Sequence, residues 1–343
     1  MRNVWPWIVG TAAIWITFVF LNNSSLLTKK TFGQPTLLAH RGISQDFDRS
    51  DLKNDTCTAT RMLPPTHAFL ENTIASMQAS FTAGANVVEF DVHPTTDGQF
   101  AVFHDWTLDC RTNGHGVTRQ HSMAYLRTLD IGYGYTADGG RTFPFRGKAI
   151  GLMPSLNEVL SAFPKGRFLI NIKSNDPNEG RLLAAALRKQ PIETLDRFMV
   201  YGGDAPIASF HAEMPTVKVM SRSTLKQCFA SYIVYGWSGI VPSACRNSII
   251  FVPINIAPWL WGWPNRFLDR MTHAGSAVFA IGPYHGGAFS TGIDTAAELR
   301  RLPEGYSGGV LTNEIQSVAA QLVRSAKASH AAPGSAAHPV AAR

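Results

Sequence analysis

Charged side chains are scarce in this sequence of 343 residues: Asp, Glu, Lys and Arg make up only 16% of it, and hydrophobic residues make up 45%. This balance excludes a chain that is disordered throughout, and it leaves enough apolar side chains for a large core. The net charge is +7, but Lys and Arg are scattered, and no basic stripe interleaved with aromatic residues occurs. We therefore expect no nucleic-acid partner. A mild attraction to anionic lipid or phosphate substrates and a merely solvated basic surface remain as alternatives.

Two common site motifs are also missing. Residues 41–44, which follow the first predicted strand, contain no Gly-rich phosphate loop. This argues against a doubly wound dinucleotide-binding sheet. No His-x-His ends the same strand, which argues against an amidohydrolase-type metal barrel.

Cysteine is rare, and the four residues present form no C-x-x-C pair. Because each pair brackets one compact stretch, we expect disulfides between Cys57 and Cys110 and between Cys228 and Cys245, as is possible outside the cytoplasm. Free buried thiols are the alternative.

Charge is absent altogether from the apolar run between Val4 and Leu21, which is about the minimum length for spanning a bilayer. No small-x-small cleavage site follows it, so we expect an uncleaved membrane anchor, with a removed signal peptide as the alternative. The flanking basic residues are balanced between the two sides. We expect the domain that follows the anchor to lie in the periplasm or otherwise outside the cytoplasm.

Three regions are predicted along the chain: an anchor and linker over 1–35, a barrel domain over 36–322, and a disordered tail rich in Ala, Ser, Pro and His over 323–343. Short apolar runs alternate with helical patterns inside the domain, which predicts α/β architecture and a (β/α)8 TIM barrel with insertions. Nine strands are predicted where a barrel needs eight, so one of the middle candidates lies outside the barrel or is not a strand. The predicted strands are 36–39, 86–92, 100–103, 167–172, 197–201, 217–220, 249–254, 277–281 and 309–311.

Polar side chains stand at the ends of the first four predicted strands. His40 follows the first, Glu89 and Asp91 close the second, His104 follows the third, and Lys173 follows the fourth. The carboxyl ends of barrel strands carry the active site, so these side chains should meet at one rim.

Glu89 and Asp91 share one face of their strand because side chains alternate along it. Two close carboxylates need a cation or a shared proton, and oxygen ligands suit Mg²⁺ or Ca²⁺. His93 is on the same face, where it either supports the site or faces solvent.

His40 and His104 are the expected acid and base for cleaving a phosphodiester, and Arg41 is suited to bind a phosphate oxygen.

The order His-Arg-Gly, Glu-Asn, Glu-x-Asp and His-Asp resembles that of the glycerophosphodiester phosphodiesterase family of phospholipase C-like barrels. Three further segments, Asp109–Gly116, Met153–Leu160 and Gly309–Asn313, also resemble the family. The resemblance implies that His40 and His104 are the acid/base pair, Glu89 and Asp91 are metal ligands, Arg41 and Lys173 bind the phosphate, and Glu71 is an active-site neighbour.

One position departs from the family pattern. Asn171 stands where the family usually has a third metal-binding Glu. An amide oxygen can still coordinate Mg²⁺ or Ca²⁺, but with one negative charge fewer we expect weaker metal affinity.

The resemblance implies metal-dependent hydrolysis of glycerophosphodiesters to sn-glycerol 3-phosphate and an alcohol. A lysophospholipase D-type activity on membrane lysolipids is the near alternative, and a non-catalytic binding module with a decayed site is the distant one. Two insertions, 44–70 and 132–151, would shape substrate choice, and a plain stabilising loop is the alternative for the first. The three tryptophans of 259–263 would contact lipid or acyl chains, and core packing is the alternative.

Overall fold

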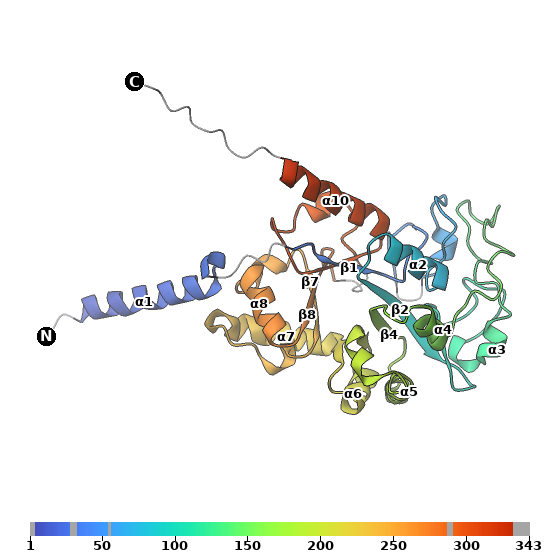
Figure 1. The fold of residues 1–343 in the computed structure, drawn as a ribbon, viewed down its shortest axis with the longest axis horizontal. Helices are drawn as coiled ribbons and strands as arrows, with labels where there is room; N and C mark the ends of the chain where they lie inside the picture. Colours follow the sequence, from blue (N-terminus) through green and yellow to red (C-terminus); the bar gives the residue numbers. More distant parts are fainter. Residues whose placement is uncertain (1–3, 28–32, 54–55, 287–290, 332–343) are drawn as a thin grey trace, which may run out of the picture.

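The computed structural model describes residues 4–27, 33–53, 56–286 and 291–331. An apolar helix, α1 (Trp5–Asn23), projects from one end of a barrel domain (Figure 1). α1 is long and apolar enough to cross a membrane, and none of its residues is buried.

Eight parallel strands form a nearly closed (β/α)8 barrel, as the sequence predicts. The order is β6-β5-β4-β2-β1-β9-β8-β7, and β6 meets β7 through a single parallel bridge between Val219 and Ser248. The barrel strands are β1 (Thr36–Ala39), β2 (Val87–Pro94), β4 (Phe168–Ile172), β5 (Phe198–Gly202), β6 (Lys218–Ser221), β7 (Ile249–Pro253), β8 (Ala277–Ile281) and β9 (Gly309–Thr312).

Each barrel strand is followed by a helix on the outer surface. Their starts are encoded locally: Thr73 accepts a hydrogen bond from the Ser76 N–H at the start of α2, and Ser155 and Glu158 form a capping box on α4. The helices are α2 (Ile74–Thr82), α4 (Leu156–Ala162), α5 (Pro177–Leu187), α6 (Asp204–Glu213), α7 (Arg222–Tyr235), α8 (Asn265–His273), α9 (Ala296–Leu299) and α10 (Ile315–Ala331), with a short α3 (Met123–Leu126) in the segment before α4.

The ninth strand, β3 (Phe100–Val102), lies outside the barrel and corrects one prediction. It pairs antiparallel with β2, with Val102 opposite Val92, so it is the return arm of a hairpin. His104 therefore does not follow a parallel barrel strand. The hairpin instead brings the chain back beside the carboxyl half of β2, where the Phe103 N–H donates to the Asp91 carbonyl over 3.1 Å.

A second, smaller apolar cluster lies beside the barrel core. It joins the insertion after β1 to the segment between β3 and α4, and its largest members include Met62, Phe103, Met123 and Tyr135. The disulfide Cys57–Cys110 connects the same two segments. The second disulfide, Cys228–Cys245, joins α7 to the loop before β7, so both predicted pairings are confirmed.

The predicted tail starts too early. Helix α10 continues to Ala331, so residues 323–331 are helical, and residues 332–343 lie outside the described residues. The side chains of Val318 and Ala319 are buried, so the first half of this helix packs on the barrel. The Ala-rich sequence that follows has high helix propensity.

Candidate active site

Two carboxylates on β2 lie at the centre of the site. Glu89 and Asp91 alternate with Val88 and Phe90, and both are fully buried inside the barrel. In the register of the sheet, Asp91 is opposite Asn171 on β4. The predicted ligand set Glu89, Asp91 and Asn171 is therefore brought to one place.

Four side chains contact the carboxylate of Asp91. Asn171 Nδ2 donates to Asp91 Oδ1 over 2.8 Å, and Lys173 Nζ lies 3.5 Å from the same oxygen. The other oxygen, Oδ2, accepts from Asn72 Nδ2 at 3.1 Å and lies 3.4 Å from Arg41 Nε. Lys173 and Arg41 thus hold the pKa of the Asp91 carboxyl well below its usual range, although burial opposes them.

The charge of the Glu89 carboxylate is offset by fewer positive groups than that of Asp91. Its oxygens accept from the Tyr201 hydroxyl at 2.7 Å and from the Arg41 N–H at 3.0 Å. Burial, and next the charge of Asp91, raise the pKa of Glu89. A carboxylate in this position calls for a proton or a further cation.

His40 extends from the carboxyl end of β1 and faces Glu89. Its Nε2 lies 3.8 Å from Glu89 Oε2, and its Nδ1 lies 2.7 Å from Asn313 Oδ1 at the end of β9. Asn313 Nδ2 donates in turn to Asp294 Oδ2 over 2.8 Å, which fixes the orientation of the amide. Burial, and next the positive charge of Arg41, lower the pKa of His40 to about 4.

Tight backbone turns place Arg41 and Asn72. Both residues have positive φ, +58° and +59°, a conformation that a bulky side chain adopts only when its surroundings impose it. The Asn72 N–H donates to the Arg41 carbonyl over 2.9 Å, which ties the two turns together. Gly42 follows with φ +78°, and a Cβ there would lie 2.5 Å from the Ser76 hydroxyl, so the His-Arg-Gly turn requires glycine against α2.

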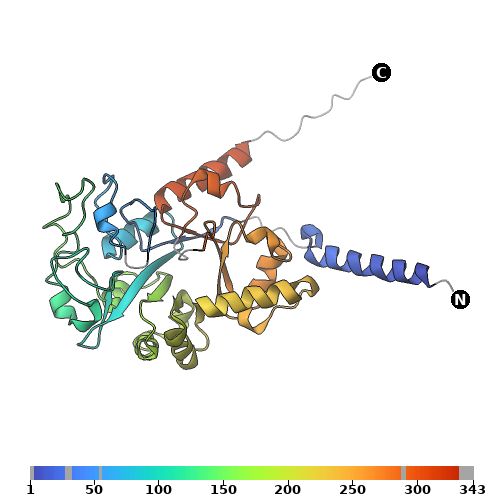
Figure 2. The ribbon, with the colours of Figure 1, turned by 180° about the vertical axis from the view of Figure 1, so that it is seen from behind.

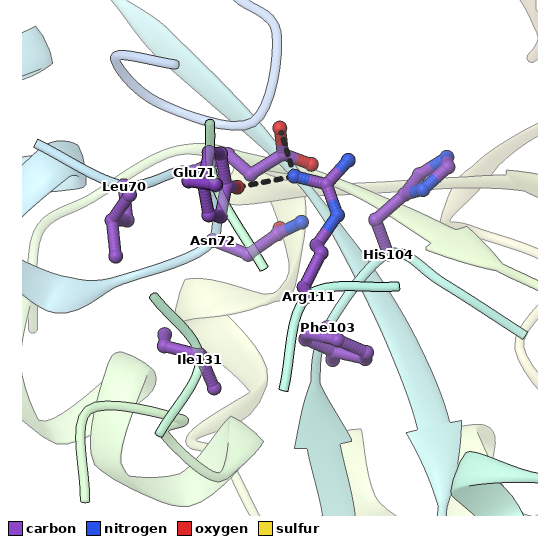
Figure 3. Close-up of a pocket in the computed structure, with 8 residues that line it drawn as sticks. Leu70, Glu71, Asn72, Phe103, His104, Arg111 and Ile131 are labelled. Carbon is purple, nitrogen blue, oxygen red and sulfur yellow. Dashed lines mark hydrogen bonds and ion pairs between the residues drawn. The ribbon is translucent and has the colours of Figure 1, made fainter. Parts of the chain in front are cut away.

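His104 is held by a chain of ion pairs that also includes Arg111 and Glu71, and Figure 3 shows these three side chains around one pocket. His104 Nδ1 lies 2.7 Å from Asp105 Oδ1, and Arg111 Nε donates to Asp105 Oδ2 over 2.9 Å. Arg111 also lies 3.0 Å from Glu71 Oε2, and Glu71 Oε1 accepts from Arg41 Nη1 at 3.1 Å. A small pocket lies beside His104, and its lining residues are Leu70, Glu71, Asn72, Phe103, His104, Arg111, Ile131 and Tyr135.

The charges at this site do not balance. Four carboxylates (Glu71, Glu89, Asp91 and Asp105) are packed with three cationic side chains (Arg41, Arg111 and Lys173), and burial lowers the pKa of both His40 and His104. With both histidines neutral and Glu89 ionised, the cluster carries one excess negative charge, and a proton on Glu89, whose pKa is raised, would cancel it. A bound divalent cation would reverse that sign and would suit a singly charged phosphodiester.

The donor chemistry fits Mg²⁺ or Ca²⁺. Two carboxylates and one amide oxygen are hard ligands, and they converge between β2 and β4. Among the described residues, no three His, Cys, Asp or Glu side chains are grouped to hold a metal, so a cation at Glu89 and Asp91 would take Asn171 as its third protein ligand. For this its amide must turn its oxygen, in place of Nδ2, toward Asp91.

Every predicted site residue lies in this one cluster, but their chemical roles stay predictions. Three participants were not singled out from the sequence: Arg111, Asp294 and Tyr201. Tyr201 ends a predicted strand, so its polar side chain at a strand end was an available signal. Arg111 and Asp294 come from irregular segments that carry no such signal.

His93 is buried, although the sequence left open a position facing solvent. Its ring makes an edge contact with Trp106, with centroids 6.0 Å apart. It thus packs against the segment that follows the hairpin.

The fold and the site define a (β/α)8 barrel with histidines, carboxylates and arginines gathered around its carboxyl-end rim. Residues 40–214 match the model of the glycerophosphoryl diester phosphodiesterase family, and the chain belongs to this family. A glycerophosphodiester phosphodiesterase of Bacillus subtilis is 34% identical over 128 residues, which cover 36% of this chain and 42% of that protein. The chain thus spans less than half the length of this relative.

Solved structures show the same fold. The glycerophosphoryl diester phosphodiesterase domain of a Mycobacterium tuberculosis protein superposes with a TM-score of 0.60 at 17% identity, covering 85% of this chain and all of that one. An Oleispira antarctica phosphodiesterase, solved in complex with the product sn-glycerol-3-phosphate, has a TM-score of 0.51 at 17% identity, with 85% and 97% covered.

Proposed function

We propose that this protein hydrolyses glycerophosphodiesters to sn-glycerol 3-phosphate and an alcohol, with His40 and His104 as acid and base. One observation carries the proposal: both histidines flank a buried carboxylate–arginine cluster, and each has its Nδ1 held by an oxygen, which directs Nε2 toward a substrate. Family membership and the product named for the Oleispira fold relative support the substrate class.

In the proposed reaction, Arg41 and Lys173 face the phosphate and offset its charge as it shifts in the transition state. A base takes a proton from the nucleophile, which is water or the neighbouring glycerol hydroxyl. An acid gives a proton to the leaving oxygen as its bond to phosphorus breaks.

The different partners of the two histidines suggest which is which. Asp105 is a carboxylate and supports a positive imidazolium, so His104 is suited to hold the proton given to the leaving oxygen. His40 faces the neutral oxygen of Asn313, which keeps its proton on Nδ1 and leaves Nε2 as the acceptor. We therefore assign His40 as the base and His104 as the acid.

Glu89, Asp91 and Asn171 would hold the divalent cation, Mg²⁺ or Ca²⁺. When bound, it would supply positive charge to the phosphate oxygens. The reason to expect it is the pair of buried carboxylates on β2, because Glu89 beside Asp91 needs either a proton or a cation.

The lysophospholipase D alternative concerns lipids of the bilayer that α1 would span. In both views α1 leaves at one end of the molecule, and the segment carrying Arg111 and Tyr135 lies toward the other end (Figures 1 and 2). This arrangement favours diesters dissolved in water over lysolipids in the same membrane. The two disulfides support a location outside the cytoplasm.

The direct test incubates the full chain with sn-glycero-3-phosphocholine and measures sn-glycerol 3-phosphate and phosphocholine separately, each with Mg²⁺, with Ca²⁺ and with EDTA. We expect sn-glycerol 3-phosphate, lost with EDTA. Lysophosphatidylcholine in detergent is the matched second substrate. Release of phosphocholine, or faster turnover of the lysolipid, would contradict the proposal.

A further inference from the structure

The base of α1 is fixed to the barrel domain by polar contacts. Asn22 Nδ2 and Asn23 Nδ2 both donate to the Trp237 carbonyl, at 3.1 and 2.9 Å. Arg270 on α8 donates to the Asn22 carbonyl at 2.8 Å and to Asn23 Oδ1 at 3.0 Å. The orientation of α1 is thus set by the domain, since these bonds come from both α8 and the turn after α7.

Arg270 also organises the domain side of this joint. Its Nη1 donates to the Tyr232 hydroxyl at 3.0 Å and to the Gly236 carbonyl at 2.9 Å, at the end of α7. About two turns further along α1, Trp15 packs against Trp237 with ring centroids 5.8 Å apart. The contact between α1 and the domain therefore continues from polar groups at the helix base to aromatic rings along its apolar stretch.

Exposed apolar side chains gather beside this joint. The C-terminal turn of α7 carries Tyr235, and Trp259 belongs to the loop after β7; they are 54% and 79% exposed. The two segments are in contact, because Trp261 Nε1 donates to the Ile233 carbonyl at 2.9 Å and the Tyr232 hydroxyl donates to the Trp261 carbonyl at 2.9 Å. We call this surface the α7 patch; its exposed members are Ile233, Val234, Tyr235, Ile240, Trp259 and Trp261.

We propose that the α7 patch rests in the interfacial layer of the bilayer that α1 spans, so that the domain is held against the membrane in one orientation. Three observations favour a lipid surface as the occupant. The patch adjoins a helix long and apolar enough to cross a membrane. The end of α7 lies on the side of the domain from which α1 leaves (Figures 1 and 2). Tryptophan and tyrosine are the side chains that settle at the boundary between lipid and water.

The polar joint fits this arrangement. Asn22, Asn23 and Arg270 form hydrogen bonds with one another and with backbone carbonyls, so they can lie at headgroup depth with their groups satisfied. The segment between β3 and α4 then lies on the side of the domain away from the bilayer (Figures 1 and 2). The inference rests on α1 remaining in the mature chain, and it does not depend on any hydrolytic activity.

The test uses the full chain in phosphatidylcholine vesicles. The mass of the purified protein is measured first, to check that α1 is retained. All four native cysteines are in disulfides, so an added cysteine is the single free thiol. Tyr235→Cys and Trp259→Cys are each labelled with a nitroxide. Leu152→Cys, 47% exposed in the segment before α4, is the matched control. Electron paramagnetic resonance then compares label access to O₂, which concentrates in lipid, with access to a water-soluble nickel reagent.

We expect the O₂-to-nickel access ratio at positions 235 and 259 to be several-fold higher than at position 152. A ratio equal to that of position 152 at either site would overturn the proposal. So would spin–spin broadening that disappears on dilution with unlabelled protein, because it would show that a second copy of the chain covers the patch.

Discussion

Asn313 bridges His40 and Asp294: its Oδ1 lies 2.7 Å from His40 Nδ1, and its Nδ2 donates to Asp294 Oδ2 over 2.8 Å. Asp294 is held in place in turn, because Arg49 from the insertion after β1 donates to it over 2.8 Å. The amide cannot turn over without losing both bonds. His40 is therefore held in one tautomer with Nε2 free to accept a proton.

Replacing Asn313 should impair turnover more than substrate binding. For Asn313→Ala we expect kcat to fall on the order of 10- to 100-fold with KM changed much less, because the tautomer and the ring orientation of His40 are no longer fixed. Steady-state kinetics on sn-glycero-3-phosphocholine measure both constants. Asp294→Asn is the comparison and should show a smaller fall, since the amide of Asn313 stays. A raised KM with an unchanged kcat would show that Asn313 has a different role.

The acid/base assignment predicts opposite responses to a good leaving group. A p-nitrophenyl phosphodiester needs little protonation of its leaving oxygen, so His104→Ala should lose far less activity on it than on sn-glycero-3-phosphocholine. His40→Ala should lose activity on both, because the nucleophile still has to give up its proton. If the p-nitrophenyl ester rescues His40→Ala instead, the two roles are exchanged.

Asn171 determines the charge of the expected metal site. In Asn171→Glu we expect Mg²⁺ or Ca²⁺ to bind on the order of tenfold more tightly, because a third carboxylate joins Glu89 and Asp91. Isothermal titration calorimetry on the metal-free protein measures the change. Asn171→Gln, which keeps the amide, is the control. Equal affinity in the wild type and in Asn171→Glu would show that the cation is not held here.

The disulfide Cys57–Cys110 should matter for activity as well as for stability. Cys110 precedes Arg111, which ion-pairs with both Glu71 and Asp105, so the disulfide holds the chain that positions His104. For the double variant Cys57→Ser, Cys110→Ser we expect a loss of roughly 2–5 kcal/mol in the free energy of unfolding and a lower kcat in the protein that remains folded.

The other disulfide provides the matched control. Cys228→Ser, Cys245→Ser removes a crosslink between α7 and the loop before β7, away from the histidines. It should lower the melting temperature and leave kcat nearly unchanged below the transition. An equal loss of kcat in both double variants would show that Cys57–Cys110 has no particular link to the site.

Residues on or next to barrel strands were predictable because their position follows from local patterns. His40, Glu89, Asp91 and Lys173 all stand at or near the end of an apolar run, and parallel strands bring such ends together. Glu89 and Asp91 share a face through simple alternation, and the structure places both inside the barrel.

His104 reached the predicted place by a different route. An apolar run predicts a strand but does not tell parallel from antiparallel pairing, so the sequence of β3 is equally compatible with a barrel strand and with the arm of a hairpin. The turn at 96–98 is the signal for a hairpin, and it shows why His104 returns beside Asp91.

Arg111 and Asp294 were not predictable, because their positions depend on tertiary packing. Arg111 is in an irregular segment held by the second apolar cluster and a disulfide. Asp294 is in the loop before α9, and only the meeting of that loop with the end of β9 brings it to Asn313.

The central claim is that two histidines carry out phosphodiester hydrolysis, and kcat of His40→Ala and His104→Ala on sn-glycero-3-phosphocholine tests it most directly. We predict a fall of roughly 10²- to 10⁴-fold in each variant, with wild-type melting temperatures. Turnover at the wild-type rate in either variant would contradict the account.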